Sequence, residues 1–143
     1  MKIRFPARAI ILESAFNAHK RKEYALSIPV LLIQADGICY DLINKQLYSK
    51  KGKVPVVAEY AETITADVFR SALLYPLTQP LPISASANER AEDFSDLNRH
   101  QVIHGESTTY DTEINSLKAI SMLNYVSYVL SRDSTDSDKE VTG

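Results

Sequence analysis

The sequence predicts an all-α fold, a four- to five-helix bundle. Only four glycines occur among 143 residues, few for a β-rich chain with many tight turns. The apolar fraction of 45% and the charged fraction of 24% are typical of a globular protein. Long stretches contain neither glycine nor proline, the residues that most often interrupt helices. We therefore expect one helical domain over residues 1–132 and a flexible acidic tail over residues 133–143.

Two helical segments are expected in the first third of the chain. Pro6 is suited to the first turn of a helix that runs through Tyr24 or beyond. A second segment, from Ile28 to about Leu47, is apolar on most sides. Pro29 lies at its start and predicts either a break between the two helices or a kink, because proline lacks the amide hydrogen that a helix uses.

A lysine-bearing loop over residues 46–55 precedes a third predicted helix, from Val57 to Leu74. The β-branched run Thr63-Ile64-Thr65 leaves open an earlier end of that helix. Three prolines within residues 76–87 exclude a regular helix and indicate a linker.

Two further helices are predicted in the second half. Ser86 and Glu89 have the spacing of a capping box, so a fourth helix is expected to begin there, run to His104 and stop at Gly105. Asp111 or Thr112 can cap a fifth helix that continues to about Leu130. Its apolar side chains surround the helix, which predicts that it is either the centre of the bundle or covered by a second subunit.

The charge is unevenly distributed. The net charge is −2, with −3 in residues 133–143 and +1 in the rest, so strong non-specific binding of nucleic acid is not expected. The single cysteine, Cys39, lies in an apolar run and is expected in the core. The longest apolar stretch, Ile28 to Ile33, is far shorter than the ~20 residues that cross a bilayer, and no signal peptide is evident. We expect a cytoplasmic protein with no membrane partner.

Residues 98–105 read Asn-Arg-His-Gln-Val-Ile-His-Gly and contain the most informative residues of the chain. Arg99 is a permanent cation whose shape matches phosphate oxygens. His104 can take up and release a proton near neutral pH. A cation and a proton carrier are the two groups needed to cleave an RNA phosphodiester without a metal.

Arg99, His100 and His104, followed by one more apolar helix, resemble the motif of the HEPN superfamily. These are all-α domains of prokaryotic defence and toxin–antitoxin systems, and many are metal-independent endoribonucleases. The specific likeness covers residues 86–130. It implies that His104 is the acid–base residue, that Arg99 binds the phosphate and that His100 assists orientation. It also implies a two-fold homodimer with both motifs at one cleft, and an antitoxin or companion defence protein as a possible partner.

Residues five apart on a helix point about 140° away from each other. Arg99 and His104 therefore need arginine's reach, an unwound helix end at Gly105 or a second copy to converge. Two other interpretations of this motif stay open. Arg99 could be a surface residue while His104 caps its own helix end. His100 and His104, spaced i, i+4, could instead share a metal ion, although we expect no metal and no cofactor.

Five other residues are candidates for binding the substrate: Asn98, Asp36, Tyr110, Lys50 and Lys51. Asp36 interrupts an apolar run, so it either anchors Arg99, lines the cleft or marks a helix face that reaches solvent. Asn98 is more easily explained as a structural cap, as are the nearby Glu106 and Asn115. The family's AMP-accepting tyrosine would fall at Glu106 here, and Tyr110 is the nearest tyrosine downstream.

The resemblance predicts cleavage of RNA to a 2′,3′-cyclic phosphate and a 5′-hydroxyl, in phage defence or as a toxin. A rival hypothesis is a non-catalytic HEPN-like dimer that binds RNA, a nucleotide or a partner protein in the same cleft. A third hypothesis is a scaffold whose last helix serves only assembly.

Overall fold

The computed structural model describes residues 5–63 and 68–141 and is mostly helical, as predicted. Its α-helices are α1 (Ala9–Lys20), α2 (Tyr24–Ile43), α3 (Val57–Thr63), α4 (Val68–Leu74), α5 (Arg99–Ile103) and α6 (Glu113–Val141). Short 3₁₀ helices cover Pro6–Arg8, Tyr75–Thr78, Pro82–Ser84 and Ala87–Glu89. Within the predicted loop, β1 (Lys50–Lys51) and β2 (Val54–Pro55) form an antiparallel hairpin that pairs Lys50 with Pro55.

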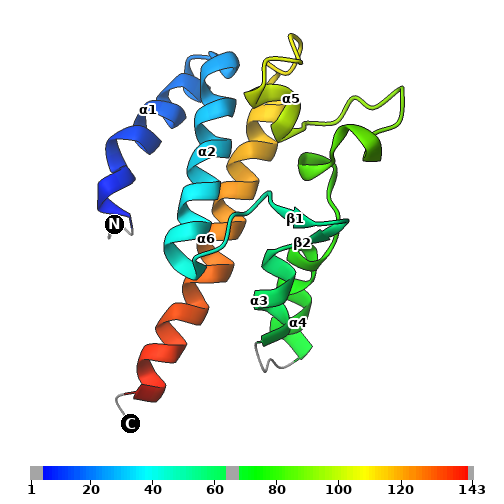
Figure 1. Ribbon diagram of the computed structural model, residues 1–143. Coiled ribbons are helices and arrows are strands. Elements are labelled where there is room, and N and C mark those ends of the chain that lie inside the picture. Colours follow the sequence, from blue (N-terminus) through cyan, green and yellow to red (C-terminus); the bar gives the residue numbers. More distant parts are fainter. Residues whose placement is uncertain (1–4, 64–67, 142–143) are drawn as a thin grey trace.

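The centre of the molecule is the pair α2 and α6, which run side by side in the same direction (Figure 1). Helix α1 packs against α2 on one side, and α3, α4 and the hairpin lie on the other side. The fully buried side chains come mainly from the two central helices: Ile28, Leu31, Leu32, Ile38, Cys39, Val126, Val129 and Leu130. The expectation that Cys39 belongs to the core is confirmed, and burial raises the pKa of its thiol to about 12.

Helix α2 is the one described helix that is long and apolar enough to cross a membrane, with a mean hydropathy of 1.5 over its best window. It is longer than the apolar run seen in the sequence because Gln34, Asp36 and Gly37 continue the helix. Yet 44% of that window is buried between α1 and α6. The central helix of a globular bundle has the same composition.

The break between the first two helices lies at Arg21–Glu23, not at Pro29. Lys22 adopts φ +64°, and α2 begins at Tyr24 and continues through Pro29. Proline cannot donate to the carbonyl of Ala25, four residues earlier. The hydroxyl of Tyr110 donates to that carbonyl instead, at 2.9 Å.

Gly37 lets the N-terminal segment pack closely on α2. The guanidinium of Arg8 crosses this glycine, and a Cβ there would lie 2.5 Å from Nη1. Arg8 donates to Asp41 from Nε at 3.1 Å and from Nη2 at 2.8 Å, and to Gln34 from Nη1 at 2.9 Å. This contact explains why position 37, inside a helix, is a glycine: any side chain there would displace the guanidinium of Arg8.

The prediction of a long fourth helix over residues 86–104 is wrong. Ser86 and Glu89 do interact, through a 2.7 Å bond between their side chains, but they close only a 3₁₀ turn. Irregular chain follows, and Asn98, with φ −134° and ψ 123°, starts the five-residue α5. The capping pattern at Ser86 depends only on neighbouring residues. Asn98 is instead held by hydrogen bonds to the carbonyls of Pro82 and Ala85, which are distant in the sequence.

The third and fifth predicted helices are found, with different bounds. Residues 57–74 contain α3 and α4, and most of the β-branched run lies outside the described residues. Thr112 caps α6, because its Oγ1 accepts from the Asn115 amide at 3.1 Å, as expected. The helix continues beyond Leu130 to Val141, so residues 133–141 are helical where we expected an irregular tail.

A buried polar chain joins the three long helices. His19 Nδ1 of α1 lies 2.8 Å from Ser116 Oγ of α6, and Ser116 Oγ lies 2.7 Å from Ser27 Oγ of α2. Both serines are fully buried. These hydrogen bonds satisfy hydroxyls that would otherwise be costly inside the core, and they set the register of the helices.

Candidate functional site

The octet folds into α5 and the turn that follows it, near the start of α6 (Figure 1). Asn98 begins this helix: its Oδ1 accepts from the Gln101 amide at 3.1 Å. Its Nδ2 donates to the carbonyls of Pro82 and Ala85, each at 2.8 Å. The side chain is enclosed, with 1% of its surface exposed. Asn98 is therefore a structural cap, and both of its donors are used by the fold instead of a substrate.

Gly105 ends α5, as the sequence predicts. Its φ of +72° is a left-handed conformation that glycine adopts without strain. His104 is the C-cap residue, and the amide of Ser107 returns to the carbonyl of Gln101 at 2.9 Å. The short helix is thus held at both ends, which places its histidines in a defined position.

The two histidines of the octet lie together. Their ring centroids are 4.3 Å apart and the planes are tilted by 43°, as the i, i+4 spacing predicts. His104 is exposed, whereas Nε2 of His100 lies 3.2 Å from Oε1 of Glu106. A carboxylate in this position can hold the His100 ring in one orientation.

Glu106 also contacts a cation that the sequence analysis missed. Nη1 of Arg90 lies 3.6 Å from Oε2 of Glu106, and the Arg90 side chain is only 9% exposed. This Nη1 forms no hydrogen bond, and Nε donates to the Ser86 carbonyl at 3.3 Å. Arg90 lies in the irregular segment where a regular helix was expected, so no periodic pattern pointed to it. Arg90, Glu106, His100 and His104 form a continuous row of charged and titratable groups.

Arg99 forms no polar contact with this row within the described chain. Its Cζ lies 5.4 Å from the ring centroid of Tyr48, a cation–π contact, and it forms no hydrogen bond or ion pair within the described chain. The Tyr48 hydroxyl donates to the Leu32 carbonyl at 2.9 Å. Burial raises the pKa of Tyr48 well above its usual value, Asp36 adds to this increase, and Arg99 opposes it. Within the described chain, no hydrogen bond, ion pair or ring contact joins Arg99 to His104.

Asp36 and Tyr110 support the backbone. Oδ1 of Asp36 accepts from the Leu47 amide at 2.7 Å, which anchors the loop after α2. Of the alternatives that the sequence left open for Asp36, a contact with Arg99 is not found among the described side chains. Tyr110 is directed to the Ala25 carbonyl, so its hydroxyl is engaged by α2.

The two candidate lysines both pair with glutamates. Nζ of Lys50 lies 2.6 Å from Oε1 of Glu89, and the lysine side chain is 10% exposed. The hydrogen bonds from Lys50 and then Ser86 lower the pKa of Glu89 to about 2. Nζ of Lys51 lies 2.8 Å from Oε1 of Glu59 and remains largely exposed. Of the two, only Lys51 is positioned to contact a ligand.

A polar hollow of about 320 Å³ lies beside α5. Its polar lining consists of Gln101, Glu106, Ser107, Thr108, Thr109 and Asn115, among others. Hydroxyl and amide groups of this kind bind sugar and base edges. Within residues 5–63 and 68–141, no three His, Cys, Asp or Glu side chains gather as they would around a metal ion.

The arrangement can support proton transfer at an exposed imidazole beside a second imidazole, a carboxylate and a guanidinium. Comparison with protein-family models, with curated proteins and with solved structures gives no match to this chain.

Proposed function

We propose that this protein is a metal-independent endoribonuclease of the HEPN type that acts in phage defence or as a toxin. The supporting observation is the exposed ring of His104 against His100, which contacts Glu106 at 3.2 Å. His104 removes the proton of the 2′-hydroxyl, and the 2′-oxygen bonds to phosphorus while the bond to the 5′-oxygen breaks. The proton that His104 has taken up then passes to the leaving 5′-oxygen, which returns His104 to its starting form. The products are a 2′,3′-cyclic phosphate and a 5′-hydroxyl.

Arg99 neutralises the phosphate in this proposal. Its guanidinium contacts only an aromatic face, and no described carboxylate competes for it. An arginine held in this way can form paired hydrogen bonds to phosphate oxygens. Since no contact joins Arg99 to His104 within the described chain, we propose that each site combines the arginine of one protomer with the histidine of its partner.

Apolar surface is available for such a homodimer. Helix α2 leaves Leu26, Ile33 and Tyr40 at least half exposed, at seven-residue spacing along one line of the helix. The packing of α2 inside the bundle supports a cytoplasmic protein without a membrane partner. An antitoxin or companion protein would restrain the activity in the cell.

The decisive experiment measures RNA cleavage by the parent protein, His104→Ala and Arg99→Ala in the presence of a chelator. We expect cleavage by the parent protein and its loss in both variants, with Arg21→Ala, an exposed arginine outside the site, as the matched control. Undiminished cleavage by both variants would exclude the mechanism.

A mixing experiment tests the shared site. A heterodimer of His104→Ala and Arg99→Ala subunits retains one intact site only if the two residues come from different protomers. We expect mixing to restore part of the lost activity. If the mixture remains inactive although heterodimers form, the two residues act within one protomer and the shared site is wrong.

The rival function, a non-catalytic dimer that binds RNA, a nucleotide or a protein, is favoured by two observations. Lys50 is paired with Glu89, and the Asn98 side chain is enclosed, so two of the residues expected to bind the substrate are held by the fold. Growth of cells on induced expression separates the two functions. Toxicity that disappears with His104→Ala supports the nuclease, and harmless parent protein supports the binding module.

A further inference from the structure

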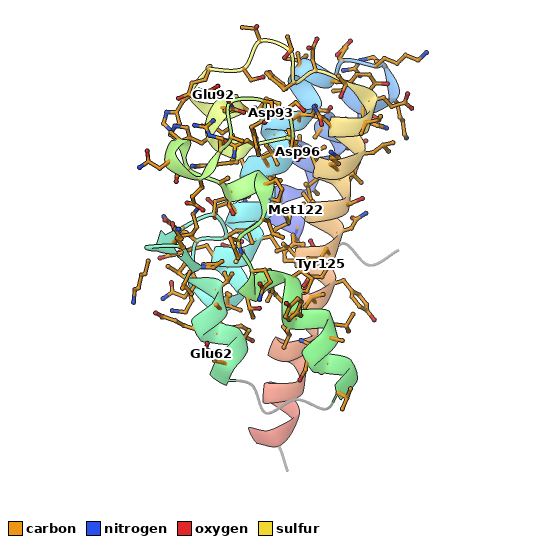
Figure 2. The ribbon with its side chains drawn as sticks, turned by 90° about the vertical axis from the view of Figure 1, so that its right-hand side faces the viewer. Glu62, Glu92, Asp93, Asp96, Met122 and Tyr125 are labelled. Atoms are coloured by element: carbon orange, nitrogen blue, oxygen red, sulfur yellow. The ribbon has the colours of Figure 1, made fainter. Side chains whose placement is uncertain are left out.

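A second hollow lies between α6 and the segments that cover it on the side of the hairpin. It has a volume of about 500 Å³ and an apolar lining. One wall is α6, and the other is formed by the hairpin and the segment that follows α4. The side chains from α6 are Ile114, Leu117, Lys118, Ser121, Met122 and Tyr125. We call this hollow the α6 groove; Met122 and Tyr125 lie on its α6 wall (Figure 2).

The α6 groove has an apolar surface that the fold leaves uncovered. Ile114 is 67% exposed and Leu117 is 47% exposed, although both belong to the wall. A water-exposed stripe of large aliphatic side chains on a monomer commonly marks a binding surface. The hydroxyl of Tyr125 is bonded to the Leu73 carbonyl, so this end of the wall is rigidly attached to α4.

The wall is straight and has the length of a helical ligand. Its members recur every three or four residues from Ile114 to Tyr125, which at 1.5 Å per residue is about 16 Å. Three turns of a second helix fit along such a line, with one apolar side chain inserted per turn. The hollow is partly open to solvent, so apolar side chains of a helix can enter it.

Acidic side chains lie beyond the two ends of the α6 groove, outside its lining, whose one charged member is Lys118 (Figure 2). Figure 2 shows Glu92, Asp93 and Asp96 above the level of Met122 and Tyr125, and Glu62 below it. Asp96 pairs with Lys118, at 3.4 Å, whereas Glu62, Glu92 and Asp93 have no ion pair or hydrogen bond within the described chain. Apolar walls between unpaired carboxylates match a ligand with leucine-like anchors and lysines or arginines beside them.

We propose that the α6 groove binds a basic amphipathic helix of a partner protein. The apolar face of this helix lies against Ile114, Leu117 and Met122, and its cations meet Glu92 and Asp93. The groove shares no residue with the histidine row, although Tyr48, which lines the groove, contacts the guanidinium of Arg99.

The test uses a fluorescent synthetic peptide of about 14 residues, with leucines on one helical face and lysines elsewhere. Binding is measured by fluorescence anisotropy against the full chain. Two control peptides are used: a scrambled one with the same composition, and one in which glutamate replaces lysine. We expect saturable binding of the lysine peptide alone. Equal binding of either control peptide would overturn the proposal.

Two matched pairs of variants locate the binding. Ile114→Gln with Leu117→Gln removes the apolar anchors without adding charge, and we expect at least about tenfold weaker binding. Ile10→Gln with Ile11→Gln removes similarly exposed residues, 80% and 44%, from α1 and should leave binding unchanged. Glu92→Gln with Asp93→Asn should weaken binding a few-fold and reduce its dependence on salt.

If the Ile114→Gln, Leu117→Gln protein and the Ile10→Gln, Ile11→Gln protein lose the same amount of peptide affinity, the peptide adheres non-specifically. That result would overturn the proposal. A second copy of this chain is the other occupant to consider. If Ile114→Gln with Leu117→Gln converts a dimer into a monomer in sedimentation, the α6 groove belongs to the dimer interface, and a separate helical partner is excluded. If the oligomeric state is unchanged while peptide binding is lost, the proposal stands.

Discussion

The hydroxyl of Tyr110 donates to the carbonyl of Ala25, which Pro29 leaves without its helical partner. Two residues 85 positions apart thus complete one turn of α2. This contact holds the loop between α5 and α6 against the N-terminal end of α2. It explains how a proline can lie inside the central helix without breaking it.

Tyr110→Phe should lower the free energy of unfolding by about 1 kcal/mol, because it removes a single hydrogen bond. Pro29→Ala restores an amide hydrogen at position 29 that can bond to the Ala25 carbonyl. In the Pro29→Ala protein we expect Tyr110→Phe to lower the free energy of unfolding by clearly less than it does in the parent. Chemical denaturation of the four proteins measures the difference. Equal costs in the two backgrounds would show that the tyrosine and the proline are not coupled.

Asn98→Ala should be the more damaging change near α5. It removes a helix cap and leaves two buried carbonyls, those of Pro82 and Ala85, without a donor, so we expect a loss of about 3 kcal/mol in the free energy of unfolding. Asn115→Ala is the control, since Nδ2 of Asn115 makes one bond, to the Tyr110 carbonyl. Similar costs for both variants would mean that Asn98 is not the anchor of α5.

The pair of Lys50 and Glu89 predicts a specific dependence of stability on pH. The pKa of Glu89 in the folded protein is about 2, below its ordinary value of 4.5. The contribution of Glu89 to stability is therefore present above about pH 4.5 and is lost as the pH falls toward 2. Glu89→Gln should therefore have a lower Tm than the parent at pH 6 and nearly the same Tm near pH 2. Glu13→Gln, on exposed α1, should match the parent throughout. A constant difference for Glu89→Gln across this range would refute the assignment.

Helix ends governed by nearby residues could be predicted from the sequence. Thr112 caps α6 and Gly105 ends α5 because both act within a few residues of their own position. The fourth helix was mispredicted because Ser86 and Glu89 carry a local helix signal, whereas Asn98 is held by carbonyls 13 and 16 residues away. Such contacts depend on how the chain is folded and leave no periodic pattern.

The histidine pair was predictable for the same reason, since its i, i+4 spacing is a property of one helix. The residues that contact this pair could not be predicted from the sequence. Glu106 was considered only as a polar neighbour, and Arg90 was missed, because its contact with Glu106 spans 16 positions of the chain. The sequence also could not show that Lys50 is neutralised by Glu89, 39 positions away.

Glu106→Gln tests whether the row from Arg90 to His104 acts in catalysis. The substitution keeps the shape of the side chain and removes the charge that faces Arg90 and His100. If Glu106 orients His100 next to His104, the rate of RNA cleavage should fall about tenfold. The Tm should change little, because the carboxylate is 47% exposed and such pairs add little to stability.

The control for this experiment is Asp111→Asn, a nearby exposed carboxylate that forms no contact within the described chain. It should retain the rate and the Tm of the parent. Full activity of Glu106→Gln would place Glu106 outside the mechanism. A fall in Tm that parallels the fall in rate would assign Glu106 a structural role. If Glu106 only orients His100, its substitution lowers the rate of the folded enzyme and leaves the Tm unchanged.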